Sequence, residues 1–293
     1  TAPLAALHGY VFRSPYAHGV IKSLDVEAAK AALGVQLVLT SKVLEDFGII
    51  GKMEASLLKN QDGQTAPNTD RFLLAKDKVR FVGEPVAMVF AETLAQARAA
   101  VELIWLEIED LPAHMDVQPG GASLHDKAPD NVAFDWAMGD LVQMETAKSE
   151  AAHVLSFDIA DNRIICNSME PRGCWAELEK GRLHLCVNGQ GVWAQKTQLA
   201  NMFGLAESEI RVTNPDVGGG FGMKAMSYPE YFLVAQATRM LGKPVRWMSD
   251  RSEAMLSDNA GRDLTSTATL TLNSDLKITG YQVQTFANMG AYS

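Results

Sequence analysis

The stretch Asp216–Lys224 holds four glycines in five positions and reads Asp-Val-Gly-Gly-Gly-Phe-Gly-Met-Lys. Glycine is favoured where the backbone takes a positive φ or where a ligand must approach main-chain N–H groups closely. Because the stretch follows a β-type run and precedes a helical one, it predicts a turn whose backbone no side chain shields. Such a turn can bind phosphates or metal-bound oxygens, and it can equally form a bulged corner of a sheet.

Two familiar phosphate-binding sequences do not fit this stretch. A P-loop needs Ser or Thr directly after Gly-Lys, whereas Lys224 follows Met223 and precedes Ala225. The dinucleotide-binding pattern G-x-G-x-x-G also fails, because a start at Gly218 would require glycine at position 223. The loop therefore belongs to neither of these nucleotide-binding classes.

The order of apolar runs predicts an α+β fold of mixed α/β type. In the first part of the chain, strands are expected over residues 7–12, 20–24, 35–39, 86–91 and 105–108, and helices over 26–33, 94–103 and a short stretch after 41. Because a helix separates strands 86–91 and 105–108, we expect a crossover within one parallel or mixed sheet. Residues 49–70 are polar and aperiodic, which predicts a long loop.

A segment rich in proline and glycine divides the chain. Residues 112–130 contain three prolines and two adjacent glycines without any period, which is typical of a linker. We therefore expect one unit over 1–111 and a second over 131–293. In the second unit, strands are expected over 152–159, 174–178, 183–187, 210–213, 245–248, 265–272 and 281–286, and helices over 193–202 and 230–241. Gly204 and Gly242 are the expected stops of these two helices.

The composition excludes several classes of protein. The chain has 293 residues, 47% of them hydrophobic and 21% charged, with a net charge of −9, so it can bury sizeable cores but has no basic surface for nucleic acid or an anionic membrane. Its apolar runs are shorter than the ~20 residues that span a bilayer, and no secretion leader opens it. The three cysteines lack C-x-x-C spacing, which argues against disulfides and self-contained zinc or iron–sulfur sites and favours the cytoplasm.

Two further segments offer polar groups in defined places. Gln190 follows an expected strand, where its amide presents both a donor and an acceptor, although an ordinary turn glutamine would give the same pattern. Glu170 and Arg172 flank Pro171 and would share one face of a strand, either as a structural ion pair or as functional groups. The six histidines show no ligand spacing, so we expect no metal held by protein side chains.

Several motifs follow one another in a distinctive order. They are Arg13-Ser14-Pro15-Tyr16-Ala17-His18, the Asp-Lys-Val-Arg-Phe-Val-Gly-Glu-Pro-Val-Ala stretch at 77–87, Glu170-Pro171-Arg172-Gly173, Gln190, the glycine-rich loop, and Gly242-Lys243-Pro244-Val245-Arg246-Trp247 with Asp250-Arg251-Ser252-Glu253. This order resembles that of the large subunits of the molybdenum hydroxylases, the family of xanthine dehydrogenase, aldehyde oxidase and carbon monoxide dehydrogenase. The resemblance covers essentially the whole chain.

The resemblance implies positions for the domains and for the site. Residues 1–111 would form an α/β hammerhead domain, 112–130 a linker, and 131–293 the first, incomplete, molybdenum cofactor-binding domain. Gln190 is the catalytic candidate, because it matches the glutamine whose amide contacts an oxygen ligand of molybdenum. Gly219, Gly220, Phe221 and Gly222 match the loop that lies against the metal and its pterin dithiolene, so they and Gln190 are the cofactor-binding candidates.

The resemblance also implies a reaction and partners. Enzymes of this family hydroxylate an aldehyde or N-heteroaromatic carbon oxidatively, with water as the oxygen source. The implied cofactor is molybdenum–molybdopterin, with the cytosine dinucleotide as one candidate form. Iron–sulfur clusters and FAD would lie on partner subunits, beside the remaining molybdopterin-binding domains or a second molybdenum subunit. Ala225 stands where xanthine-oxidising members carry a glutamate, which argues against xanthine.

The sequence leaves two alternatives open. The family's general base lies far downstream, so this chain alone is expected to lack it, and a chain that starts without methionine and stops behind a strand favours a fragment or processed subunit. The chain would then be a non-catalytic fragment or scaffold without cofactor. The other alternative is an unrelated α/β module that binds a phosphate through the glycine-rich loop.

Overall fold

The computed structural model describes residues 2–55 and 58–292. These residues form two compact units that do not follow chain order. Unit 1 is built from residues 2–55, 70–113 and 166–259, and unit 2 from residues 58–69, 114–165 and 260–292. Unit 1 therefore combines an early and a late part of the chain.

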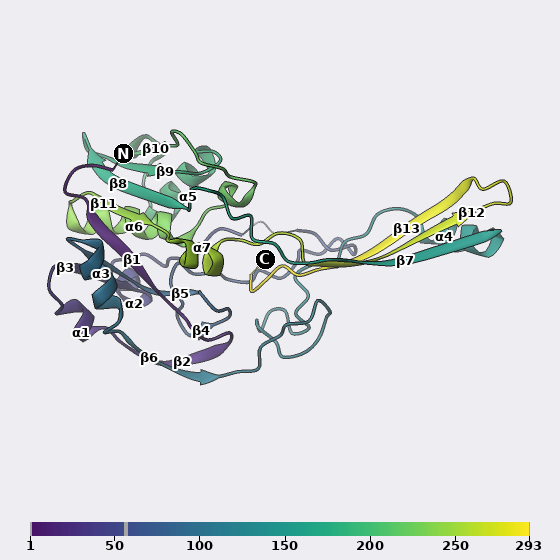
Figure 1. The fold of residues 1–293 in the computed structure, drawn as a ribbon, viewed down its shortest axis with the longest axis horizontal. Coiled ribbons are helices and arrows are strands. Elements are labelled where there is room, and N and C mark those ends of the chain that lie inside the picture. Colours follow the sequence, from purple (N-terminus) through teal and green to yellow (C-terminus); the bar gives the residue numbers. More distant parts are fainter. Residues whose placement is uncertain (1, 56–57, 293) are drawn as a thin grey trace. The chain divides into compact units, whose positions relative to one another are not determined.

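A mixed sheet of seven strands is the centre of unit 1 (Figure 1). Its strands, in order across the sheet, are β10 (Ile210–Thr213), β9 (Arg182–Val187), β8 (Gly173–Glu179), β11 (Val245–Met248), β1 (Leu7–Arg13), β5 (Pro85–Ala91) and β3 (Val35–Thr40). β1 pairs in parallel with β11, with Leu7 opposite Val245. This pair joins the two distant parts of the chain in one sheet.

The expected crossover between residues 86–91 and 105–108 is wrong, because the two strands lie in different sheets. β5 is a buried inner strand of the large sheet, whereas β6 (Trp105–Asp110) forms a small antiparallel sheet with β2 (Gly19–Asp25) and β4 (Lys78–Val79). Leu106 and Ile108 of β6 pack instead on a small cluster that contains Val79 and Val86. The helix between them, α3 (Leu94–Val101), thus links two sheets.

The helices of unit 1 differ in how well the sequence predicts them. They are α1 (Glu27–Lys30), α2 (Ser41–Asp46), α3, α5 (Trp193–Phe203), α6 (Pro229–Leu241) and α7 (Arg251–Ser257), with 3₁₀ turns η1 (Glu207–Glu209) and η2 (Met223–Ala225). Gly204 and Gly242 end α5 and α6 in the left-handed conformation, as predicted. α1 is shorter than the expected 26–33, because Leu33 is exposed and gives a further turn no apolar contact. α6 is buried over 229–238 and packs on β8, β9 and β11.

Unit 2 contains an antiparallel sheet of three strands with one helix. The strands are β13 (Ile278–Ala287), β12 (Leu264–Leu272) and β7 (His153–Asp161), in that order, and the helix is α4 (Leu141–Glu150). A Cβ at Gly280 would lie 2.9 Å from Met144 Sδ and 3.1 Å from Ala147 Cβ, so the glycine allows α4 to pack closely on β13. α4 could not be predicted from apolar periodicity, because Met144 is its one buried residue.

In the part of the chain that the structure describes, none of the helices has both the length and the apolar character required to cross a bilayer.

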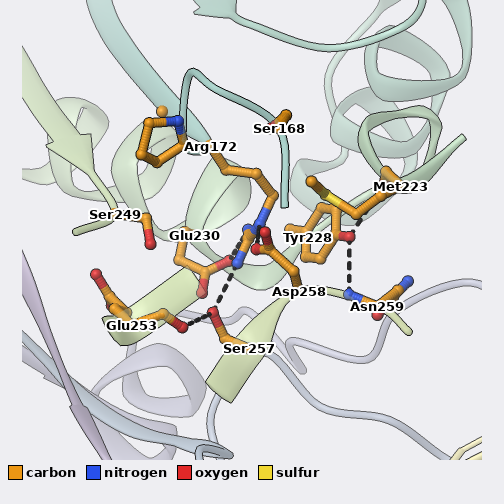
Figure 2. A network of polar contacts seen from close by, with 12 residues as sticks. Ser168, Arg172, Met223, Tyr228, Glu230, Ser249, Glu253, Ser257, Asp258 and Asn259 are labelled. Atoms are coloured by element: carbon orange, nitrogen blue, oxygen red, sulfur yellow. Dashed lines mark hydrogen bonds and ion pairs between the residues drawn. The ribbon is translucent and has the colours of Figure 1, made fainter. Parts of the chain in front are cut away.

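A buried network of charged groups centres on Arg172 (Figure 2). Its Nε donates to Asp258 Oδ1 at 2.5 Å, its Nη1 to Glu230 Oε2 at 3.0 Å and its Nη2 to Ser257 Oγ at 2.9 Å. The guanidinium carbon also lies 3.6 Å from the ring centroid of Tyr228, a cation–π contact. The single arginine thus ties α6 to the segment at the end of α7.

The same network includes Arg13, from the motif at residues 13–18, and contacts Gly83, from the motif at residues 77–87. Arg13 Nη2 contacts Glu230 Oε1 at 2.5 Å and Glu253 Oε1 at 2.7 Å, and Arg13 Nη1 donates to the Gly83 carbonyl at 3.0 Å. Gly83 has a φ of +100°, and a Cβ there would lie 2.8 Å from the Leu256 carbonyl oxygen. Glycine therefore lets this turn approach α7, and Glu230 joins both arginines.

Replacing Arg172 with methionine should be strongly destabilising, because Glu230 and Asp258 would remain buried without their cation. We expect Arg172→Met to lower the free energy of unfolding by about 3–5 kcal/mol in urea titrations. The control is Arg98→Met, which removes an exposed pair with Asp250 and should cost less than about 1 kcal/mol. Equal losses in the two variants would contradict the central role of Arg172.

The network also predicts loss of stability in acid. Burial by itself would raise the pKa of Glu230, but Arg172 and Arg13 outweigh it and lower this pKa to about 2, from 4.5. A carboxyl with a depressed folded-state pKa stabilises the fold above its unfolded pKa, so this contribution is lost as the pH falls from about 4.5 to 2. Glu230→Gln should flatten that part of the stability profile.

Glu253→Gln is the matched control for this profile. Burial raises the pKa of Glu253 despite Arg13, so its effect on stability has the opposite sign, and stability falls as the pH rises through its titration. The Glu253→Gln variant should therefore keep the acid loss that Glu230 causes. If the unfolding free energy of Glu230→Gln fell with decreasing pH as steeply as that of the unsubstituted protein, another group would be responsible for the loss of stability in acid.

Candidate functional site

The glycine-rich loop, residues 216–224, leaves the sheet after β10 and ends in η2. None of its residues belongs to a strand, so it is not a bulged corner of the sheet. Three of its residues have a positive φ, +98° at Gly219, +54° at Phe221 and +83° at Gly222. Phe221 is 70% exposed. The loop thus presents main chain and one aromatic ring at the surface of unit 1.

Glu170 joins the beginning of the loop to its end. Its Oε2 accepts a hydrogen bond from Gly218 N–H at 2.8 Å and contacts Lys224 Nζ at 3.1 Å. The Lys224 side chain is fully buried, and Glu170 is about one third exposed. Burial tends to raise the pKa of Glu170, but the Gly218 N–H and Lys224 outweigh it and lower the pKa. The carboxylate is therefore the fixed charged partner of Lys224.

The expectation that Glu170 and Arg172 share one face of a strand is wrong. β8 begins only at Gly173, and Asn188 holds the preceding backbone instead of a neighbouring strand. Asn188 Oδ1 accepts from Gly173 N–H at 2.8 Å, and Nδ2 donates to the Pro171 carbonyl at 2.7 Å. Glu170 consequently pairs with the loop, whereas Arg172 enters the buried network.

Gln190 lies three residues after the end of β9 and contacts the loop with both its backbone and its side chain. Its N–H donates to the Lys224 carbonyl at 3.0 Å, and its Oε1 accepts from Gly222 N–H at 2.9 Å. A Cβ at Gly220 would lie 2.5 Å from the Gln190 amide carbon, so a side chain at position 220 would force the Gln190 amide out of this position. Within the described residues, Nε2 of the exposed Gln190 has no hydrogen-bond partner, and it remains available as a donor.

The structure brings together all five residues that the sequence proposes for cofactor binding. Gln190 contacts Gly220 and Gly222, a Cβ at Gly219 would lie 2.9 Å from the Phe221 ring, and the Phe221 carbonyl accepts a weak hydrogen bond from Cys166 Sγ at 3.6 Å. The arrangement offers a neutral amide donor beside an unshielded backbone. It can therefore bind a group that carries several oxygen acceptors.

Sequence reasoning missed the residues that support this arrangement. Tyr228 Oη donates to the Met223 carbonyl at 3.0 Å while its ring lies against Arg172, so the buried network reaches the end of the loop (Figure 2). The Glu170–Lys224 pair was missed as well. The available signal for this pair was that Glu170 and Lys224 carry opposite charges and that each belongs to a distinctive motif, Glu-Pro-Arg-Gly and the glycine-rich loop.

Removing the Glu170 charge should destabilise the loop, because it leaves the buried Lys224 ammonium without its partner. We expect Glu170→Gln to cost about 1–3 kcal/mol of unfolding free energy. Glu179→Gln, which removes an exposed pair with Arg211, should cost less than about 1 kcal/mol.

A double-mutant cycle tests whether the pair itself carries this effect. The double variant Glu170→Gln with Lys224→Met should be more stable than the sum of the two single losses predicts, because the unpaired charge has been removed. Strictly additive losses in urea titrations would mean that the two residues do not act as a pair.

Comparisons with known proteins agree with the resemblance. Residues 124–293 match the family model of the molybdopterin cofactor-binding domain, and residues 2–112 match that of the aldehyde oxidase and xanthine dehydrogenase a/b hammerhead domain. The large subunit of nicotine 6-hydroxylase from Paenarthrobacter nicotinovorans is 37% identical over 98% of this chain and 35% of that protein. The carbon monoxide dehydrogenase large chain of Hydrogenophaga pseudoflava is 30% identical over 98% of this chain and 36% of that protein.

Solved structures show the same similarity. A Cu,Mo-containing carbon monoxide dehydrogenase matches with a TM-score of 0.86 and 29% identity over 97% of this chain and 37% of that chain. Quinoline 2-oxidoreductase from Pseudomonas putida 86 matches with a TM-score of 0.85 and 32% identity over 100% of this chain and 37% of that chain. The chain spans about a third of the length of the curated relatives it matches. It combines an α/β hammerhead domain with a molybdenum cofactor-binding domain, and it belongs to the molybdenum hydroxylase family.

Proposed function

We propose that this chain binds molybdenum–molybdopterin within a larger enzyme that hydroxylates an N-heteroaromatic or aldehyde carbon oxidatively. Water is the source of the oxygen in this proposal, and electrons pass to iron–sulfur clusters and FAD on partner subunits. The observation that carries the proposal is the Gln190 amide, fixed by Gly222 N–H with its NH₂ group free beside the glycine-rich loop. Family membership supplies the identity of the cofactor.

The residues of the loop fit such a cofactor. Gly220 cannot carry a side chain without striking Gln190, while a Cβ at Gly222 would meet no atom within 4 Å, so the backbone there is open to a ligand. Main-chain N–H groups can donate hydrogen bonds to an anionic group without adding a charge of their own. When bound, the cofactor supplies the redox chemistry, and the chain supplies position and hydrogen bonds.

Gln190 has one defined task in this proposal. Since Oε1 accepts from Gly222 N–H, the amide cannot flip without losing that bond, and Nε2 is held as a donor. It would donate to an oxygen atom of the bound group and orient it toward the substrate. Gly219, Gly220, Phe221 and Gly222 would support the same group, without any metal ligand from this chain.

The names of two relatives favour one class of substrate. They refer to nicotine and quinoline, which are both N-heteroaromatic. Ala225 offers no carboxylate for a purine. We therefore place N-heteroaromatic compounds before aldehydes, and carbon monoxide after both. The cytosine dinucleotide form of the pterin is part of the same proposal.

The proposed assembly needs components beyond this chain. We propose residues 1–111 as the hammerhead domain, 112–130 as the linker and 131–293 as the first cofactor-binding domain, with the general base and further pterin contacts on the remaining molybdopterin-binding domains or a second subunit. A cytoplasmic location is proposed because the three cysteines are free thiols.

The complete enzyme allows a direct test of Gln190. Gln190→Ala should lower kcat by about tenfold to a thousandfold, the range for loss of one positioned donor. Gln190→Glu should also lower kcat, because a carboxylate can still accept from Gly222 N–H but has no NH₂ group to donate. Gln198→Ala, a half-buried glutamine on α5, is the control and should leave kcat unchanged.

Molybdenum content, measured on the same preparations, separates positioning from cofactor loss. We expect the metal content of both Gln190 variants to stay near that of the unsubstituted enzyme. An unchanged kcat in Gln190→Ala with full metal content would remove Gln190 from the reaction.

A further inference from the structure

The sheet of unit 2 has one apolar and one polar face. Residues directly opposite one another in neighbouring strands share a face, and Leu270 of β12 lies opposite Leu155 of β7 and Tyr281 of β13. Ala268 lies likewise opposite Phe157 and Val283. We define the apolar face by six of its residues, Leu155, Phe157, Ile159, Leu270, Tyr281 and Val283.

The opposite face is polar and is the one that the helix of unit 2 contacts. Thr269 and Ser156 share a hydroxyl–hydroxyl hydrogen bond of 3.1 Å, and Thr267 donates to Asp158 at 2.7 Å. α4 packs on this side, where Gly280 lies opposite Thr271. The helix therefore leaves the apolar face without a cover from its own unit.

The apolar face is too exposed for a surface that stays in water. Phe157 is 61% exposed, Tyr281 67% and Ile159 53%, although a half-buried sheet normally turns its apolar residues to a core. A contiguous group of exposed apolar side chains marks a contact surface. The alternation of apolar and polar residues along β7 and β13 is therefore typical of a sheet with one face buried against another polypeptide.

We propose that the apolar face is the surface on which the remaining molybdopterin-binding polypeptide packs, an inference that rests on the proposed function. Only 35% of the nicotine 6-hydroxylase large subunit corresponds to this chain, so about two thirds of such a protein lies outside the matched region. All three strands fall inside the part that matches the cofactor-binding family model. The partner surface is apolar and packs on the sheet face to face.

Thiol labelling of the complete enzyme tests this proposal. Val283 and Gln284 are neighbours on β13 that point to opposite faces, and both are exposed in unit 2, so Val283→Cys and Gln284→Cys form a matched pair. We expect the new thiol of Val283→Cys to react with a maleimide at least about tenfold more slowly than that of Gln284→Cys, since it is reached only when the interface opens. Phe157→Cys is a second variant on the apolar face, and the unsubstituted enzyme gives the background of the native cysteines.

Cross-linking identifies what covers the face. A cross-linker with one maleimide arm, attached to Val283→Cys, and one photoreactive arm that inserts into C–H bonds should join this residue to the remaining molybdopterin-binding polypeptide. Equal labelling rates on the two faces, or a cross-link to a second copy of this chain, would overturn the proposal. Because labelling does not depend on the metal, loss of molybdenum with intact protection would count against the proposed function alone.

Discussion

The Arg172 guanidinium has no exposed surface, and the rest of unit 1 depends on how that buried charge is satisfied. Glu230 and Asp258 neutralise it, Tyr228 lies against its face, and Glu230 is shared with Arg13. A buried ion group of this kind contributes little net stability, but loss of one member is costly. Its effect is therefore to fix one arrangement of segments that lie far apart in the sequence.

That arrangement carries through to the glycine-rich loop. Tyr228 connects the network to the Met223 carbonyl, and the Glu170–Lys224 pair holds the two ends of the loop. Between these two contacts the backbone of the loop stays open. Its Gly222 N–H donates to the side-chain oxygen of Gln190, so the NH₂ group of that amide points outward. The rigid interior thus determines the direction of a single neutral donor at the surface.

Much of the secondary structure could be predicted from the sequence, because the strands are short apolar runs and glycines end α5 and α6. The grouping of strands into sheets could not be predicted, since local periodicity does not reveal that β6 pairs with β2 rather than joining the sheet of β5. At the site, the glycine run and Gln190 stood out as motifs. The residues that support them did not, because the partners of Glu170 and Arg172 are 48 to 86 residues away in the chain.

The most direct test of this account is the molybdenum content of the native complex that contains this chain, compared with the same complex carrying Gly222→Ala. The account predicts near-stoichiometric molybdenum in the native complex. It also predicts loss of the metal in the variant while unit 1 stays folded, because the new methyl group would occupy the open space beside the Gly222 backbone, where a Cβ meets no atom within 4 Å and where the cofactor is proposed to bind. A native complex without molybdenum, or a folded variant that retains all of it, would contradict the assignment of the loop as the cofactor-binding element.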